Sequence, residues 1–446
     1  HVAALANSGS DYFFLSRPRR FGKSLLIDTL KQAFLGNIDV FKELFLEKNW
    51  DWNIQYPVIH LSFAGGSAYK SKENLHALID VQIEKHAKLY GVTLSNLTQN
   101  TQFEELISKV VEKTGLKVVL LVDEYDKPIL DVIDSPSEAK ENREILKGFY
   151  SVVKDLDAQL RFVFFTGVSK FSKVSLFSGL NNLDDISLNP LYADICGYTQ
   201  LEMDPAFFEH FEAGKVDKVK LKSWYNGYNF SGLESQKVYN PFDILLFCNN
   251  AYRYKNYWFE TATPTFLIKL LETKQHFIPT FESVLVSDSE LSSFDIDTIP
   301  IKTLLFQTGY LTIKETAQIG MQYGYTLSYP NLEVKASLND SLLTLGSSIE
   351  TKGQSLTAVD KVLKTAQFDD LKQIFNAHFA SIPHDWYRKN PMGRYEGFYA
   401  GIIYSCFAAL GYDLTAEDTT STGRIDLAIV MPDKIVIIEF KLSKYG

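Results

Sequence analysis

The sequence contains few cysteines, with three among 446 residues and no two close enough to form a CxxC pair. Cys196, Cys248 and Cys406 therefore provide neither a disulfide framework nor a cysteine zinc site. Isolated thiols of this kind are typical of proteins in a reducing compartment. We accordingly expect three buried thiols and a cytoplasmic protein.

The sequence also lacks a long hydrophobic run and an excess of positive charge. No apolar stretch approaches the roughly 20 residues that a membrane-crossing helix needs, and no charged-then-apolar leader follows His1. We therefore expect no membrane partner, and a first residue other than Met indicates that the chain starts inside a longer protein. Lys and Arg number 45 against 54 Asp and Glu, a net charge of -9, so any nucleic-acid site must be local.

The length and composition favour several packed domains. At roughly 150 residues per domain, 446 residues predict about three domains. Hydrophobic residues make up 46% of the chain and aromatic residues 14%, which suits packed cores and, less often, base stacking. We find no internal repeat and no low-complexity segment.

Apolar runs alternate with helix-length segments in the first 200 residues. The runs lie at 12–15, 58–63, 117–122 and 161–166, and polar, periodic segments such as 73–90 and 138–157 separate them. Alternation of this kind predicts βαβ units and a parallel sheet.

The pattern changes after about residue 205. A helix is expected over 240–250, with Asn240 as N-cap and Pro241 in its first position. A helix from 302, followed by strand-like segments that continue through LEVKASL (332–338), predicts a small helix-plus-hairpin module. An apolar helix over 394–410 and two strands, IDLAIV and IVIIEF, then predict a second α/β unit.

The stretch SRPRRFGKS, between the first strand and a helix, resembles a phosphate-binding loop. Consecutive backbone N–H groups of the loop, with Phe21 and Gly22 among its residues, would cradle phosphates at the helix N-terminus, with Lys23 reaching the β and γ phosphates and the Ser24 hydroxyl binding Mg²⁺. Arg19 or Arg20 could supply additional positive charge. Two residues depart from the usual GxxxxGK[ST] pattern. Arg17 stands where the first glycine is usual, and Pro18 has no N–H. The alternative is a GKS sequence that arises by accident at a basic helix start.

Acidic residues follow the third apolar run, in KVVLLVDEYDK. Ligands bind at the carboxyl ends of parallel strands, so Asp123 could hold the Mg²⁺ shell and Glu124 could polarise the attacking water. A solvated acidic turn is the alternative. The fourth run ends at the same edge, where Thr166 is our choice to sense the γ phosphate, with Ser169 and Lys170 nearby. An ordinary strand-end hydroxyl is the alternative for Thr166.

A second group of charged residues lies near the end of the chain. Asp426 in GRIDLAIV and Glu439 and Lys441 in IVIIEFK would meet across a hairpin, since Glu439 and Lys441 share a strand face roughly 6 to 7 Å apart. Two carboxylates can bind a divalent cation while an ammonium positions the water that attacks a phosphodiester. Glu396, on the preceding helix, could complete the metal shell. The alternative is a surface hairpin with ordinary charges.

Together these motifs resemble a bacterial family in which an AAA-ATPase-like domain precedes a PD-(D/E)XK nuclease-superfamily domain. The resemblance rests on FLSRPRRFGKSL, VVLLVDEYDKPI, FTGVSKFS, WYNGYNF, VYNPFDIL, GYLTI and GRIDLAI with IIEFK, and it spans essentially the whole chain. The Arg17 departure is itself shared with that family.

The resemblance implies an α/β fold with four parts. These are an AAA-like P-loop ATPase domain with a parallel sheet (1–205), a helical lid (206–285), a winged-helix-like helix-plus-hairpin module (286–374) and a C-terminally incomplete PD-(D/E)XK nuclease-like domain (375–446). Lys23 and Ser24 would bind nucleotide, Asp123 and Glu124 would serve metal binding and hydrolysis, and the nuclease cluster would comprise Asp426, Glu439, Lys441 and Glu396. The implied cofactors are ATP and Mg²⁺, with Mn²⁺ as an alternative at the nuclease site.

These observations favour an enzyme in which ATP binding and hydrolysis control a metal-dependent nuclease that acts on DNA. One alternative is an ATP-switched regulatory protein whose nuclease fold only binds nucleic acid. Another is a nuclease with a degenerate ATPase unit, which Arg17 and Pro18 motivate. AAA-like ATPases often form rings, but no arginine finger is recognisable, and a homo-oligomer stays open.

Overall fold

The structure is a computed structural model, and the part of the chain that it describes consists of many segments. These are residues 1–65, 69, 71–95, 98–170, 173–233, 237–261, 281, 283–292, 300–343, 349–380, 396–420 and 423–439.

A five-stranded parallel sheet forms the N-terminal unit, in the spatial order β2-β3-β4-β1-β5. The strands are β1 (Tyr12–Ser16), β2 (Val58–Ser62), β3 (Val118–Asp123), β4 (Leu160–Gly167) and β5 (Asp184–Asp185). The four longer strands coincide with the four apolar runs, which confirms the predicted parallel sheet. Strands β1 and β3 are buried along their whole length, and this explains why their sequences are apolar without alternation.

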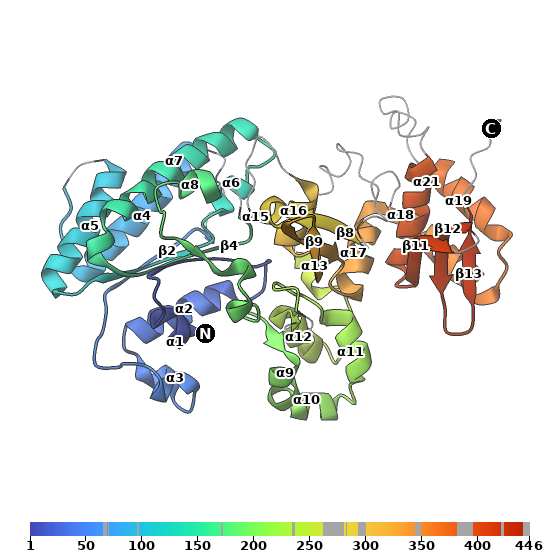
Figure 1. Ribbon diagram of the computed structural model, residues 1–446, viewed down its shortest axis with the longest axis horizontal. Helices are drawn as coiled ribbons and strands as arrows, with labels where there is room; N and C mark the ends of the chain where they lie inside the picture. Colours follow the sequence, from blue (N-terminus) through green and yellow to red (C-terminus); the bar gives the residue numbers. More distant parts are fainter. Residues whose placement is uncertain are drawn as a thin grey trace.

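Helices cover both faces of this sheet (Figure 1). One face carries α4 (Lys72–Tyr90), α5 (Gln99–Thr114) and α7 (Pro136–Asp155), and the other carries α1 (Val2–Ala6) and α2 (Lys23–Phe34). Shorter helices complete the unit: η1 (Ile38–Phe41), α3 (Phe45–Lys48), α6 (Lys127–Leu130), η2 (Asp157–Gln159), α8 (Lys173–Leu176), η3 (Ile186–Leu188) and η4 (Pro190–Tyr192).

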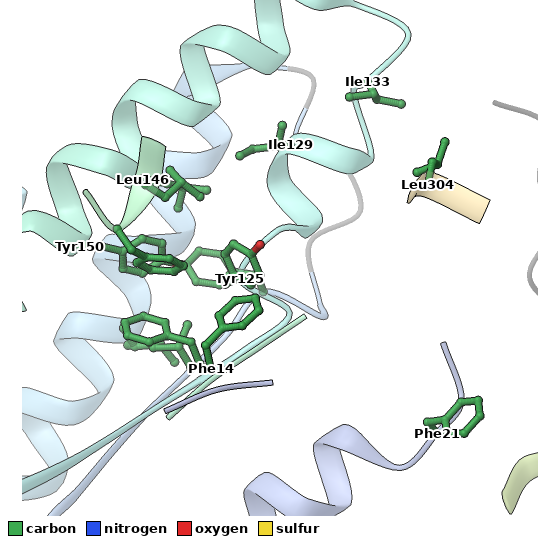
Figure 2. Close-up of a cluster of buried hydrophobic side chains, with 14 of the residues drawn as sticks. Phe14, Phe21, Tyr125, Ile129, Ile133, Leu146, Tyr150 and Leu304 are labelled. Atoms are coloured by element: carbon green, nitrogen blue, oxygen red, sulfur yellow. The ribbon is translucent and has the colours of Figure 1, made fainter. Parts of the chain in front are cut away.

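Neighbouring residues of each strand feed two different cores, because successive side chains of a strand point to opposite faces. Phe14 packs with the α7 side, where Tyr125 and Tyr150 lie over it (Figure 2). Phe13 and Leu15 pack instead with the α2 side. The sheet is thus held between two apolar layers.

A mainly helical segment follows the sheet. Its elements are β6 (Tyr198–Thr199), α9 (Gln200–Ala206), α10 (Phe208–Ala213), α11 (Lys218–Tyr225), β7 (Val238–Tyr239), α12 (Pro241–Asn249) and α13 (Tyr257–Thr261). Helix α12 begins as the sequence predicts, because the Asn240 side chain accepts a hydrogen bond from the Phe242 N–H at 2.9 Å.

The next segment contains the expected helix and hairpin. Its elements are β8 (Val284–Ser287), α15 (Asp288–Ser292), α16 (Ile301–Thr308), β9 (Thr312–Ile319), β10 (Gln322–Ser328) and α17 (Leu332–Leu343). Strands β8, β10 and β9 form an antiparallel sheet in that order.

The strand expected over residues 332–338 is wrong, since these residues form the first part of α17. Asn331 accepts a hydrogen bond from the Val334 N–H at 3.0 Å and so caps a helix. Val334, Leu338 and Leu342 are buried and spaced four residues apart, as on one helix face. The seven residues of LEVKASL are too few to distinguish the two-residue period of a strand from the roughly 3.6-residue period of a helix. The Asn331 cap and the four-residue spacing of buried side chains as far as Leu342 show that the segment is helical.

The C-terminal unit consists of helices and an antiparallel sheet. Its elements are α18 (Ile349–Thr365), α19 (Asp370–Ala380), α21 (Glu396–Ala409), β11 (Asp413–Thr420), β12 (Gly423–Val430) and β13 (Ile435–Ile438). The predicted apolar helix and the two predicted strands are confirmed. Phe407 of α21 packs against Leu427 and Ile429 of β12, which gives this unit a core of its own. Within the described residues, no helix is both long and apolar enough to cross a membrane.

Candidate functional site

The loop between β1 and α2 ends in a left-handed glycine. Gly22 is the N-cap of α2 and has φ 86°, a conformation that side-chain-bearing residues seldom adopt. Helix α2 begins at the next residue, Lys23, so the free N–H groups of its first turn lie directly after the loop. A helix N-terminus of this kind favours an anion.

The Lys23 ammonium is folded back onto the loop. It donates hydrogen bonds to the backbone carbonyls of Arg17 and Pro18, both at 2.9 Å, and its side chain is buried. Burial lowers the pKa of Lys23, while the carboxylates of Asp126 and Asp123 act in the opposite direction. The ammonium is therefore a desolvated cation held by neutral dipoles, which is a suitable partner for phosphate.

Ser24 and Asp123 meet as the sequence predicts for a magnesium-binding pair. The Ser24 hydroxyl donates to Asp123 Oδ2 at 2.6 Å, although the two residues are 99 positions apart. Asp123 is the last residue of β3 and is 3% exposed. Its second oxygen, Oδ1, is buried and has no hydrogen-bond partner among the described residues. A buried carboxylate oxygen without a partner beside a hydroxyl suits a hard cation, so these residues fit Mg²⁺.

Glu124 follows at the end of the strand in a left-handed conformation, with φ 54°. This backbone is uncommon for a glutamate and occurs often at functional sites. Burial raises the pKa of Glu124, and Lys127 partly offsets this effect.

Arg17 has a structural position that explains its presence in place of glycine. Its guanidinium donates to five backbone carbonyls, those of Ser16, Ser187, Tyr192, Ala193 and Ile195, at 2.8 to 3.4 Å. The guanidinium also stacks on the Phe230 ring, 4.0 Å from its centroid. Burial lowers the pKa of Arg17 to about 10. Arg17 thus ties the start of the loop to residues 187–195 rather than facing a ligand.

The other predicted loop residues occupy different environments. The Arg19 side chain is exposed, and so is that of Arg20, which lies 4.8 Å over the Phe242 ring. The Phe21 ring is buried against Tyr228, so this residue can offer a ligand only its backbone. The Thr166 hydroxyl donates to the Leu15 carbonyl at 3.0 Å inside the sheet, which gives it a partner away from the strand end.

Sequence reasoning missed Asp126, which organises the end of β4. Its carboxylate is fully buried and accepts hydrogen bonds from the N–H groups of Val168 and Ser169 and from the Ser169 hydroxyl. Burial raises the pKa of Asp126, and the Ser169 hydrogen bonds oppose the shift. Lys170, beside it, is buried and forms an ion pair with Asp185 at 2.9 Å. The sequence signal was available, because Asp126 is the third acidic residue of DEYD and follows the end of β3, as Glu124 does.

The C-terminal candidates are only partly described. Leu427 pairs with Ile438 across the β12–β13 hairpin, so the next residues outward, Asp426 and Glu439, are adjacent on the two strands. Glu396 is the first residue of α21, and its side chain lies outside the described residues. Lys441 lies outside them entirely. The pairing supports the predicted meeting of the two carboxylates and leaves the other two members as predictions.

The described part of the chain contains no group of three His, Cys, Asp or Glu side chains that could hold a metal ion. The nuclease metal cluster therefore remains a prediction.

Comparison with known proteins gives two family matches and one close relative. Residues 1–177 match the family described as predicted AAA-ATPase, and residues 394–446 match the PD-(D/E)XK nuclease superfamily. The chain is 46% identical over 433 residues to an uncharacterized protein in the vnfD 5'region of Azotobacter chroococcum mcd 1. This match covers 97% of the chain and 82% of the relative. No solved structure matches the chain.

Proposed function

The chain belongs to the family of proteins that join a predicted AAA-ATPase domain to a PD-(D/E)XK nuclease superfamily domain, and we propose that its N-terminal unit binds and hydrolyses ATP. We further propose that this unit regulates a metal-dependent nuclease in the C-terminal unit, with DNA as substrate. The observation that carries the proposal is the 2.6 Å hydrogen bond from Ser24 to Asp123, which joins the loop to the end of β3.

Three residues would hold the Mg²⁺–ATP complex. The Lys23 ammonium would exchange two neutral carbonyls for phosphate oxygens, a stronger, charge-assisted contact. Ser24 and Asp123 would hold Mg²⁺, since their oxygens already lie together and one Asp123 oxygen lacks a partner among the described residues. Bound Mg²⁺ neutralises charge that develops on the phosphates during transfer.

Glu124 is the candidate proton acceptor for hydrolysis. A general base works best when its pKa approaches the working pH, and burial raises the pKa of Glu124 in that direction. Its position directly after Asp123 places it at the strand end where the phosphates would lie.

The ATPase proposal is tested with two variants and their controls. Lys23→Ala should reduce ATP affinity at least tenfold, because about 1.4 kcal/mol of charge-assisted binding already corresponds to a factor of ten. Glu124→Gln should bind ATP but hydrolyse it roughly 100-fold to 10,000-fold more slowly. Lys85→Ala and Glu141→Gln, which alter exposed helix residues, should match the wild type. Unchanged ATP affinity in Lys23→Ala would refute the loop assignment, and normal phosphate release by Glu124→Gln would refute its role as base.

The nuclease proposal is tested by cleavage of DNA and RNA substrates with Mg²⁺ or Mn²⁺, with and without ATP. Asp426→Asn should abolish cleavage, whereas Asp433→Asn, in the turn of the same hairpin, should retain it. Cleavage lost in both Lys23→Ala and Asp426→Asn supports an ATP-gated nuclease. ATP turnover without cleavage by any form would instead support the ATP-switched binding protein.

A further inference from the structure

A tryptophan from the segment after the sheet contacts the middle of the phosphate loop. Trp258, in α13, is 1% exposed, and its indole N–H donates to the Arg19 carbonyl at 3.1 Å. The two residues are 239 positions apart in the sequence, so this is a tertiary contact between two units of the fold.

This contact fixes the direction of one loop peptide. The carbonyls of Arg17 and Pro18 face the Lys23 ammonium, whereas the carbonyl of Arg19 faces Trp258. In a planar trans peptide the N–H points opposite to the carbonyl. The Arg20 N–H is therefore directed away from Trp258, and Arg20 itself is left-handed with φ 67°. Trp258 thus orients a backbone donor within the stretch that would cradle phosphate.

Trp258 is in turn held by the accessory helices. Its backbone N–H donates to Glu333 Oε1 at 2.8 Å, in the first turn of α17. Its ring packs edge-on against Tyr310, with centroids 5.1 Å apart. Gly309 approaches the loop so closely that an added Cβ would lie 2.7 Å from the Pro18 Cβ. The loop is therefore supported by α13, α16 and α17 together.

Helix α17 extends the connection to the C-terminal unit. Helices α17 and α21 pack against each other, and the Lys335 ammonium lies 6.0 Å from the centroid of the Tyr404 ring. Leu343, at the end of α17, belongs to the core that contains Tyr404 and Phe407. The same helix therefore contacts Trp258 through Glu333 and packs against α21, which begins with Glu396.

We propose that Trp258 is the positioning residue through which nucleotide occupancy of the phosphate loop is transmitted to the C-terminal unit. The inference rests on the proposed ATP binding and adds a route for its regulatory effect. Nucleotide binding reorients loop peptides, the Arg19 carbonyl moves with them, and the Trp258–Glu333 contact passes the displacement to α17 and α21. For the two units to be coupled in this way, bound nucleotide must favour one arrangement of the loop, Trp258, α17 and α21 over another.

The test compares Trp258→Phe with the wild type by hydrogen–deuterium exchange, with and without saturating ATP and Mg²⁺. Phenylalanine keeps an aromatic ring in the core but has no N–H for Arg19. In the wild type, ATP should slow exchange in the loop, α17 and α21. In Trp258→Phe, ATP affinity should fall roughly twofold to tenfold, the usual effect of one lost hydrogen bond, and the ATP effect on α21 should fall by more than half even at saturation.

Controls separate loss of coupling from loss of folding. Trp224→Phe, in α11, makes the same substitution at a residue whose contacts are with Tyr225 and Tyr254, and it should behave as the wild type. If Trp258→Phe melts early, benzothienylalanine at position 258 replaces only the N–H, by sulfur, at nearly equal volume. Exchange in β3 without ATP reports whether either variant is folded.

The outcomes distinguish the two proposals. A wild type that binds no ATP would overturn the proposed function, and the inference with it. A wild type that binds ATP without any effect on α17 and α21 would overturn the inference alone. The inference alone would also be overturned if ATP at saturation slowed hydrogen–deuterium exchange in α21 of the folded Trp258→Phe protein as much as it does in the wild type.

Discussion

Arg17 illustrates how an arginine side chain can fix the start of a loop at a position where the usual phosphate-loop pattern has glycine. Glycine in a phosphate loop allows the backbone to approach its ligand closely. Here the start of the loop is fixed instead by a guanidinium whose donors are shared among five carbonyls. Arginine is suited to this task because its planar group carries five N–H donors, which lysine cannot match.

Asp243 and Glu333 form a second unusual pair at the residue scale. Both are fully buried, Asp243 in α12 and Glu333 in α17. Burial raises the pKa of Asp243 to about 7, and burial together with the charge of Asp243 raises the pKa of Glu333 well above its usual value. Two buried carboxyl groups that interact so closely are tolerable only if the pair retains a proton.

This pair predicts a pH-dependent stability. The folded state holds protons that the unfolded state loses above about pH 4, so the free energy of unfolding should fall as pH rises from about 4 through about 7, and the raised pKa of Glu333 should continue the fall at higher pH. The contribution of one such proton is roughly 1 kcal/mol per pH unit. Asp243→Asn should show a shallower decline than the wild type in urea unfolding at pH 5, 6 and 7. The exposed Asp155→Asn should keep the wild-type slope, and an equal slope in Asp243→Asn would contradict a shared proton.

At the scale of elements, the close approach of α16 to the loop depends on Gly309. This residue ends α16 with φ 93°, and an added Cβ would meet Pro18 at 2.7 Å. Gly320, in the β9–β10 turn, has φ 63° but has open space around an added Cβ. Both glycines have a left-handed backbone, but only Gly309 has a neighbouring side chain that an added Cβ would contact.

Comparison of Gly309→Ala with Gly320→Ala therefore distinguishes the effect of backbone strain, which both variants have, from the effect of the contact with Pro18, which only Gly309→Ala has. Both should lose about 1 kcal/mol in stability, since each forces alanine into the left-handed region. Gly309→Ala should lose more, and it alone should weaken ATP binding, because its methyl group displaces Pro18 next to the carbonyl that holds Lys23. Urea unfolding and ATP titration measure the two effects. Equal ATP affinity in both variants would show that α16 does not set the loop geometry.

Elements differ in how well their sequences determine them. The parallel strands and α12 could be predicted because long apolar runs and the Asn240–Pro241 start each allow one interpretation. Helix α17 could not, since its alternation is short and its helical spacing extends past it to Leu342. Lys23, Ser24 and Asp123 were predictable from their places at a helix start and a strand end. The contact of Trp258 with Arg19 left no sequence signal, because it arises only when distant segments pack.

At the scale of the whole molecule, the core on the α7 side of the sheet is separate from the core of the C-terminal unit. Phe14 of the sheet and Val334 of α17 belong to one continuous core, which spans the N-terminal unit and the accessory helices. Phe407 and Leu427 belong to a separate core in the C-terminal unit. We expect the first core to unfold as one cooperative unit.

Calorimetry should show this division as two unfolding transitions. Saturating ATP with Mg²⁺ should raise the transition of the larger unit, by about 3 kcal/mol in stability at 100 times the dissociation constant. Lys23→Ala should show no such increase. Hydrogen–deuterium exchange measured across the temperature range shows which unit unfolds in each transition. A single transition in the absence of ATP would show that the packing of α17 against α21 joins both cores into one cooperative unit.

A ligand of Lys23 must interact with its ammonium more strongly than the carbonyls of Arg17 and Pro18 do, so we expect weakly charged ligands to be excluded. The ammonium leaves Arg17 and Pro18 only for a partner that offers more than two neutral dipoles in a desolvated setting. Chloride or a weakly charged metabolite gives too little, whereas the terminal phosphates of a nucleoside triphosphate bring several negative charges at once. If the loop binds ATP as proposed, it would thereby discriminate among the small anions of the cell before any base or sugar is recognised.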